Sequence, residues 1–591
     1  MKLAYKLEDF AMNFITYGGL PNAKISIEKK AEKDGVLFFD VDMILEEEAV
    51  PQQFTVCWNF PIIDTLSTWS PTIKAWRYLA PHWKAQRTTS RTASWMPIHC
   101  HFSRDGRNRQ TVAVADAKTP ISLLSGANDN TAELYCAIEF FTNPVAPIKE
   151  YHTTIRIDLR DIPYEQAIRD VTKWWETDCG YTPAFVPEYA KYPMNSTWYS
   201  YHRDLVEDDL LRECELSKPL GMETILIDDG WQRGEGHHMV GDWMVNADKF
   251  PDFKDFVDKV HEIGMKVMVW FSVPFLGKWS ALEEGRENPV YTRFKDMVLN
   301  GGTDGFGGTF HFDPRYKEVR DYLVDIYVSR VQEWGIDGLK LDFIDWFNLT
   351  DISLKPDDRR DIKSLEEAID ALMLAVHDAL IKVKPDILIE FRETYVGPCI
   401  RQYGNMLRVI DCPNDALINR GDTINLRLIS GDTAIHSDML MWNVNEPVEN
   451  AAMQITNCIF SVPQISMRIQ ALPEDHKKML GFYLDFWRKN RDILAYGDIF
   501  AKNPEFGYSM AYAVKDKEAV YALYADTAVD IEDMKTAKII NSTRLDALIV
   551  ENAEGRDFEV VNCMGEVLET GKIESNLAKI NVPLSGIIFI K

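Results

Sequence analysis

Between residues 165 and 495 the sequence alternates between helix and strand patterns, and this alternation restricts the fold more than any other feature. Stretches with apolar residues three or four positions apart end at Gly or Pro, and each precedes a short apolar run. The clearest pairs are FKDFVDKVHEIG before MKVMVWFS, KEVRDYLVDIYVSRVQEWG before IDGLKLDF, and LEEAIDALMLAVHDALIKVKP before DILIEF. Alternation over about 300 residues predicts a parallel sheet. The length suits one (β/α)8 TIM barrel, and a doubly wound sheet is the alternative.

The two ends of the chain read as β structure. Short runs rich in aromatic and β-branched residues, such as GVLFFDVDMIL and AELYCAIEFF, are separated by turn sequences such as SRDGRN. The same pattern returns in YSMAYAVKDKEAVYALYAD and the final SGIIFIK. We therefore expect a multidomain fold of the α/β plus β class. Its predicted parts are an N-terminal β-sandwich at 1–165, a catalytic barrel at 166–494 and a C-terminal β-sandwich at 495–591.

Composition limits the partners and cofactors. The net charge of −26 disfavours nucleic acid and anionic membranes as partners, and no window is apolar enough for a membrane span. The nine cysteines form no CxxC pair, and DDGW lacks the spaced ligands of a calcium loop, so we expect no metal and no cofactor. The odd cysteine count and the start MKLAYKLEDFAMNF predict a cytoplasmic protein. A periplasmic or secreted protein whose signal was already removed is the alternative, and a homo-oligomer is compatible with the sequence.

Acids, arginines and tryptophans recur at the ends of the predicted strands. In a (β/α)8 barrel the active site lies at the carboxyl ends of the strands. A single Asp there is commonly a helix cap or turn residue, but recurrence over five strands favours a site. The side chains at these ends include Trp198, Asp228, Asp229, Trp231, Trp270, Lys340, Asp342, Asp345, Glu390, Arg392, Arg408, Asp411, Asp415, His436, Asp438 and Trp442.

One of these strands carries two ionisable residues in a run that is otherwise apolar. In WGIDGLKLDFIDWF, residues 334–347, Lys340 and Asp342 are two positions apart and therefore point to the same face of a strand. Paired carboxylates beside aromatic side chains favour glycoside hydrolysis. That chemistry needs one carboxylate at the anomeric carbon and one carboxylic acid at the leaving oxygen. The alternative is a structural ion pair inside the barrel.

Several motifs, in order, resemble the α-galactosidase (melibiase) clan, glycoside hydrolase families 27 and 36. ILIDDGWQ is similar to the clan's double-Asp strand, GIDGLKLDF to its nucleophile strand, CIRQYGNMLRVIDCPND to its acid/base strand and HSDMLMWN to the strand that follows. The resemblance runs from about Trp198 to Gln464, and the flanking sandwiches are similar to family 36 in architecture only.

The resemblance implies a role for each matching residue. Asp342 would be the nucleophile and Asp411 the general acid/base, while Asp228 and Asp229 would bind the galactose 4- and 6-hydroxyls. Lys340 would contact the sugar. The full set of predicted substrate-binding residues is Trp198, Asp228, Asp229, Trp231, Lys340, Glu390, Arg408, Asp438 and Trp442.

The sequence departs from the family 36 pattern in two places. In DCPND the acids are spaced differently, so Asp411 is the preferred acid/base and Asp415 the fallback. In EFRETYVGPCIRQ, Arg392 or Glu393 falls near the region that reads the sugar's 2-position, which argues against N-acetylgalactosamine.

The resulting expectation is a retaining exo-acting α-galactosidase with its two carboxyl groups about 5–5.5 Å apart. Nearby negative charges are expected to raise the pKa of Asp411.

Alternatives are an α-N-acetylgalactosaminidase, a β-L-arabinopyranosidase, an enzyme for a modified galactose or a raffinose-synthase-like transglycosylase. A non-catalytic carbohydrate-binding protein is the alternative from another class. Such a protein would be expected to lose a catalytic carboxylate, and both candidates are present here. An oligosaccharide or glycoside is the expected ligand in every case.

Overall fold

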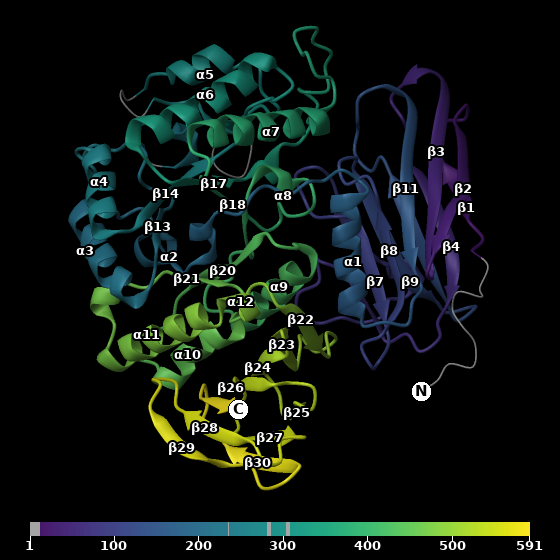
Figure 1. Cartoon of the computed structure of the whole chain (residues 1–591). Helices are drawn as coiled ribbons and strands as arrows, with labels where there is room; N and C mark the ends of the chain where they lie inside the picture. The colour runs from purple at the N-terminus through teal and green to yellow at the C-terminus, as the bar shows by residue number, and fades with distance from the viewer. Residues whose placement is uncertain (1–11, 235, 281–284, 303–307) are drawn as a thin grey trace.

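A closed barrel of parallel strands forms the centre of the molecule (Figure 1). The computed structural model describes residues 12–234, 236–280, 285–302 and 308–591. Closure of the sheet decides for the (β/α)8 barrel and against the doubly wound alternative. The barrel strands, in spatial order, are β12 (Met194–Ser196), β13 (Thr224–Ile227), β14 (Lys266–Ser272), β17 (Gly338–Asp342), β18 (Leu388–Arg392), β19 (Met406–Arg408), β20 (Ala434–Leu440) and β21 (Val462–Ile465).

Amphipathic helices surround the barrel because their apolar faces pack on the strands. The helix α4 shows how the sequence sets their ends: the Asp252 carboxylate caps its first turn, and Gly264, with φ 90°, ends it. The helices of this region are α2 (Trp198–Tyr201), α3 (Glu207–Ser217), α4 (Phe253–Ile263), α5 (Pro289–Phe294), α6 (Lys317–Trp334), α7 (Leu365–Val383), α8 (Ile400–Tyr403), α9 (Ala416–Ile429), α10 (Val448–Asn457), α11 (Glu474–Lys489) and α12 (Arg491–Leu494). A short hairpin of β15 (Phe275–Gly277) and β16 (Thr309–His311) follows β14.

The inside of the barrel changes from apolar to charged along its axis. At the amino ends of the strands, Leu226, Met268 and Leu388 belong to a small buried apolar cluster. Two residues further along, Lys340 is paired in register with Glu390, and Arg392 with Arg408. Because inward-facing side chains recur every second residue, the apolar layer supports a charged layer at the carboxyl ends.

Two antiparallel sheets form the N-terminal part, in the orders β1-β4-β10-β9-β6 and β2-β3-β11-β8-β7-β5. Leu37, Phe54, Trp58 and Ile138 belong to the core between them. The helix α1 (Tyr164–Thr177) then leads into the barrel. The strands are β1 (Ile15–Gly18), β2 (Lys24–Lys33), β3 (Val36–Ala49), β4 (Phe54–Pro61), β5 (Ser67–Trp69), β6 (Gln86–Ser90), β7 (Ile98–Phe102), β8 (Asn108–Val114), β9 (Ile121–Asn128), β10 (Glu133–Phe140) and β11 (Ile148–Asp158).

The C-terminal part has a seven-stranded sheet, β22-β23-β24-β26-β31-β28-β29, and a three-stranded sheet, β25-β27-β30. Its strands are β22 (Asp498–Lys502), β23 (Met510–Lys515), β24 (Glu518–Leu523), β25 (Ala528–Asp530), β26 (Thr536–Asn541), β27 (Ala547–Glu551), β28 (Asp557–Val561), β29 (Val567–Lys572), β30 (Leu577–Asn581) and β31 (Ile587–Ile590). The predicted boundaries at 165 and 494 fall in the first turn of α1 and at the end of α12, and as domain limits they remain our proposal.

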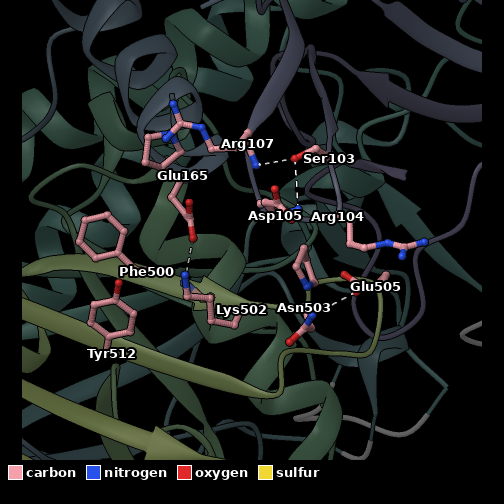
Figure 2. Close-up of a pocket in the computed structure, with 14 residues that line it drawn as sticks. Ser103, Arg104, Asp105, Arg107, Glu165, Phe500, Lys502, Asn503, Glu505 and Tyr512 are labelled. Atoms are coloured by element: carbon pink, nitrogen blue, oxygen red, sulfur yellow. Dashed lines mark hydrogen bonds between the residues drawn. The ribbon is translucent and has the colours of Figure 1, made fainter. Parts of the chain in front are cut away.

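The N-terminal sandwich, α1 and the C-terminal sandwich meet at one junction (Figure 2). The backbone N–H of Ala501 donates to the Glu165 carboxylate at 2.9 Å, and Tyr164 donates to the carbonyl of Ala501 at 3.0 Å. Burial raises the pKa of Glu165 to about 7. This contact ties the start of α1 to strand β22.

All nine cysteines are free thiols, eight of them buried. In the part of the chain that the structure describes, no helix has the length and apolarity needed to cross a bilayer.

Candidate functional site

A cavity of about 440 Å³ opens at the carboxyl ends of the barrel strands. Both predicted catalytic residues, Asp342 and Asp411, line it. The side chains and backbone around it come from α2, β14, β17, β18 and the loops that follow the barrel strands. They are Trp198, Arg203, Asp228, Asp229, Gly236, His237, His238, Trp270, Lys340, Asp342, Phe343, Arg392 and Asp411.

Four hydrogen-bond donors surround the carboxylate of Asp342. Its Oδ1 accepts from the Arg392 Nε at 3.0 Å, from the Phe343 N–H at 2.8 Å and from the Tyr395 hydroxyl, while its Oδ2 accepts from the Trp270 indole at 2.9 Å. Phe343 has a left-handed φ of 65° immediately after the strand. Burial alone would raise the pKa of Asp342, but Arg392, Lys340 and these donors outweigh it and hold the pKa below its usual range. Asp342 is therefore an ionised, fixed carboxylate.

Lys340 links the nucleophile candidate to the double-Asp strand. Its ammonium lies 2.7 Å from Asp228 Oδ2 and 3.9 Å from Asp342 Oδ2. Asp229, next along the chain, pairs with Arg203 at 2.6 Å. The carboxylates of Asp228 and Asp229 thus line the cavity with fixed orientations, which suits hydrogen bonding to neighbouring hydroxyl groups.

Asp411 lies on the loop after β19 and keeps 45% of its side chain exposed. The Arg408 guanidinium bonds its Oδ1 at 2.7 Å. Burial raises the pKa of Asp411, but Arg408, Arg392 and Lys340 outweigh both burial and the charge of Asp342, so the pKa is lowered. This corrects the sequence-based expectation of a raised pKa, which counted the acids around Asp411 and not the cations.

Three predicted substrate-binding residues lie beneath the cavity and do not line it. Arg408 is 1% exposed and bonds Asp438 as well as Asp411, and Glu390 is fully buried against Gln464 inside the barrel. Asp438 also accepts from the Tyr199 hydroxyl and the Cys412 N–H. Their strand-end positions were predicted correctly, but their inward side chains form a buried network that holds Asp411. None of the three side chains lines the cavity, and their contact with sugar stays a prediction.

Two predicted tryptophans lie in the core. Trp231 is fully buried, donates to the carbonyl of Trp270 at 2.8 Å and stacks on Trp243. Trp442 is 2% exposed and donates to His476 at 3.1 Å. Both residues follow strand ends, but the chain turns them back into the helix layer, so neither contacts the cavity. Trp198 and Trp270 are the predicted strand-end tryptophans that do line it.

The fallback acid, Asp415, caps a helix. Its Oδ1 accepts from the Ile418 N–H at 3.1 Å at the start of α9, and the side chain is exposed outside the cavity. The geometry therefore favours Asp411 over Asp415 as the second carboxylate.

The prediction omits Arg203, His237 and His238, which line the cavity, and Tyr395, which does not line it but bonds Asp342. The first three lie several residues beyond the ends of β12 and β13. Their positions could not be predicted from the strand ends, because the path of the loop is not known from the sequence. Tyr395 comes three residues after β18, and its hydroxyl reaches Asp342 only because the loop turns back. The only sequence signal for Tyr395 was that an aromatic residue follows shortly after the strand that carries Glu390 and Arg392.

The N-terminal sandwich supports two loops of the site from outside. Arg91 donates to the carbonyls of Asp345 and Phe347 after β17. Lys74 pairs at 2.5 Å with both Glu393, after β18, and Asp422 of α9. Glu393 thus points away from the cavity while its neighbour Arg392 points into it. Trp58 and Trp69 of the sandwich are buried.

Among the described residues, no group of three or more His, Cys, Asp or Glu side chains has an arrangement that could hold a metal ion.

The chain is similar to several known proteins. The Melibiase family model matches residues 189–399. Alpha-galactosidase Mel36A of Lactobacillus acidophilus is 31% identical over 207 residues, which are 33% of this chain and 26% of that protein. Alpha-galactosidase 1 of Pediococcus pentosaceus is 32% identical over 150 residues, 25% of this chain and 20% of that protein. The matched segment therefore spans about a quarter of these relatives' length.

Solved structures share the whole architecture. The GH36 alpha-galactosidase AgaA of Geobacillus stearothermophilus, in complex with 1-deoxygalactonojirimycin, superposes with a TM-score of 0.64 at 16% identity over 96% of this chain and 81% of that one. The alpha-galactosidase of Lactobacillus brevis gives 0.63 at 14% identity over 98% and 84%. These likenesses show a TIM barrel flanked by β-sandwiches, which confirms the predicted fold class.

Proposed function

We propose that this chain, a member of the α-galactosidase (melibiase) clan that is similar to glycoside hydrolase family 36, is a retaining exo-acting α-galactosidase. The observation that carries the proposal is the pair Asp342 and Asp411 in one cavity at the barrel mouth. Asp342 is a buried carboxylate fixed by four donors, and Asp411 is partly exposed. A fixed anion and a more accessible acid on one cavity are the two groups that retaining glycoside hydrolysis needs.

In the first step, protonated Asp411 donates to the leaving oxygen while Asp342 attacks the anomeric carbon. This forms a glycosyl ester on Asp342 and releases the aglycone. In the second step, Asp411 takes a proton from water, which attacks the same carbon and frees Asp342. Two inversions leave the released sugar in the α configuration.

The rest of the cavity suits one sugar ring. Asp228 and Asp229 offer carboxylate acceptors to adjacent hydroxyls, and Trp198 and Trp270 offer apolar faces. Its volume of about 440 Å³ lies in the range of small-ligand pockets and favours removal of a terminal residue. Structures of the Geobacillus enzyme AgaA hold raffinose and stachyose, so we propose an oligosaccharide substrate.

A panel of nitrophenyl glycosides tests the proposed substrate. We expect release from the α-galactoside at least about tenfold above the α-N-acetylgalactosaminide and the β-L-arabinopyranoside. A preference for either of the latter would replace the proposal by the corresponding alternative. Transfer to sucrose or galactinol that exceeds hydrolysis would favour the transglycosylase. Sugar binding in a calorimeter without any product would favour the non-catalytic protein.

Three Asp→Asn variants test the residues. Asp342→Asn removes the nucleophile, so kcat should fall by about 10³-fold or more while galactose binding persists. Asp411→Asn should lose most activity on poor leaving groups and less on nitrophenyl substrates, which need less protonation. Asp415→Asn is the matched control, because Asn also caps helices. The assignment of Asp411 is wrong if Asp415→Asn shows the larger loss.

A further inference from the structure

Arg392 bonds one carboxylate of the cavity, Asp342, and lines the same cavity as the other, Asp411. Its Nε donates to Asp342 Oδ1 at 3.0 Å, and its Nη1 donates to the carbonyl of Glu393 at 2.9 Å. The guanidinium is also held over the rings of Phe343 and Tyr395, 5.2 Å from each centroid. Among the described residues none accepts a hydrogen bond from Nη2, and Arg392 lines the same cavity as Asp411. The side chain is therefore fixed on one side and free on the other.

The proposed reaction moves one negative charge across this cavity. Before the first step Asp342 is a carboxylate and Asp411 is a neutral acid. In that step the bond from the anomeric carbon to the leaving oxygen breaks, a bond to Asp342 forms, and the Asp411 proton goes to the leaving oxygen. Asp342 is then a neutral ester and Asp411 a carboxylate. Water reverses both changes: its oxygen bonds to the anomeric carbon, the ester bond breaks, and its proton goes to Asp411.

Of the cations that the structure describes near the carboxylates, no other donates a hydrogen bond to Asp342. Lys340, on β17, contacts Asp228 at 2.7 Å but Asp342 only at 3.9 Å. Arg408, on β19, bonds Asp438 and Asp411 and does not reach Asp342 in the structure. Arg203, which also lines the cavity, bonds Asp229 at 2.6 Å. The nearby anions are Asp228 and Asp229, which follow β13, and Asp345 after β17. Arg392 alone among these cations bonds Asp342 directly, and it also lines the cavity with Asp411 and acts on that carboxylate through its charge.

We propose that Arg392 is a positioning residue whose positive charge serves both carboxylates in turn, Asp342 before the sugar is transferred to the enzyme and Asp411 after it. This rests on the proposed function. A fixed cation that acts on both sites needs no reorganisation when the anion moves from one to the other, which is how preorganised charges lower a barrier. The pKa directions agree, because the charge of Arg392 lowers the pKa of both Asp342 and Asp411.

The test compares Arg392→Met, which removes the charge, with Arg392→Lys, which keeps it. We measure kcat/KM for a nitrophenyl α-galactoside from acid to alkaline pH. In Arg392→Met both limbs of the profile should move to higher pH, because both carboxylates lose the same cation, and the maximum should fall by about 10²–10³-fold. Arg392→Lys should keep the wild-type limbs with a smaller loss.

Arg401→Met is the matched control for folding. Arg401 is also largely buried, with 3% of its side chain exposed against 14% for Arg392, and it pairs with Glu176 at 2.6 Å, away from the cavity. It should lower thermal stability without moving either limb. If Arg392→Met is folded but inactive at every pH, activity of Arg392→Lys within about tenfold of wild type still supports the proposal, and an inactive Arg392→Lys overturns it. Unmoved limbs in an active Arg392→Met also overturn it. Failure of the proposed function itself is distinct, because the wild type would then release no galactose.

Discussion

The two carboxylates of the cavity have opposite protonation requirements. Asp342 must be ionised to attack, and its four donors stabilise that state. Asp411 must be protonated to begin the reaction, yet Arg408 bonds it and lowers its pKa. The spacing of Lys340 and Asp342 on one strand face allowed both to be predicted from the sequence. The electrostatics of Asp411 could not be predicted, because they depend on cations from three different strands.

The pH dependence of kcat/KM follows from these directions. Activity requires ionised Asp342 and protonated Asp411, and both pKa values lie below that of an ordinary Asp, about 3.9. As pH rises through the Asp411 pKa, the protonated acid is lost and kcat/KM should fall by about tenfold per unit. We therefore expect the highest kcat/KM at acidic pH in a buffer series. A plateau that extends above pH of about 7 would show that the Asp411 pKa is raised instead.

Tyr395→Phe tests the donor that sequence reasoning missed. The variant keeps the ring but removes the hydroxyl that donates to Asp342 Oδ1, and hydrogen bonds to charged groups contribute about 1.5–3 kcal/mol. We expect kcat/KM to fall at least about tenfold and the acid limb to move to higher pH, since the carboxylate is less stabilised. Tyr403→Phe, which removes a bond to Asp370 outside the cavity, should leave that limb in place. If the acid limb of the kcat/KM profile lies at the same pH in both variants, Tyr395 has no special role.

At the scale of elements, close strand contact sets the geometry of the charged layer. Periodicity in the sequence predicted the alternating strands and helices, because each amphipathic stretch can bury its apolar face in only one way. It could not place Trp231 or Trp442, because a residue just after a strand can turn into the cavity or into the helix layer. Gly338 begins β17, the strand that carries Lys340 and Asp342, and a Cβ there would lie 2.6 Å from the Cβ of Leu388.

Gly338→Ala should therefore separate β17 from β18. Neither Leu388 Cβ nor its carbonyl, 2.7 Å from the added carbon, can move without a backbone shift. Overpacking of this kind costs about 1–3 kcal/mol. We expect a lower melting temperature and, since β17 carries Asp342, reduced kcat. The control is Gly481→Ala in α11, where the nearest atom lies at 3.4 Å, and which should be neutral or stabilising. A Gly338→Ala protein as stable as wild type would contradict this packing account.

At the scale of the whole molecule, the N-terminal sandwich fixes loops of the barrel. Arg91 and Lys74 reach across to the loops after β17 and β18, which hold Asp345 and Glu393 beside the cavity residues. The sequence predicted the sandwich from strand and turn patterns alone. It could not predict these contacts, because they join residues more than 250 positions apart.

Lys74→Met tests this coupling. It leaves the carboxylates of Glu393 and Asp422, both fully buried, without their shared cation. Removing one partner of a buried pair costs about 3–5 kcal/mol, so the melting temperature should fall by several degrees and kcat should fall with it. Lys118→Met is the control. It breaks another ion pair between the sandwich and the barrel, with Asp370, in which the Lys118 side chain is 40% exposed, so it should cost about 0–1 kcal/mol. Similarly small changes in melting temperature and kcat for both variants would show that the contacts of Lys74 with the barrel do not support the site.

The central claim, that Asp342 is the nucleophile of a double displacement, is tested most directly by azide. In Asp342→Gly the attacking carboxylate is replaced by a space that azide can enter, on the face of the sugar opposite the leaving group. With a nitrophenyl α-galactoside and azide, this variant should form β-galactosyl azide, identified by the proton coupling at its anomeric carbon. Formation of the α-azide, or restored release of galactose without any azide product, would contradict the assignment.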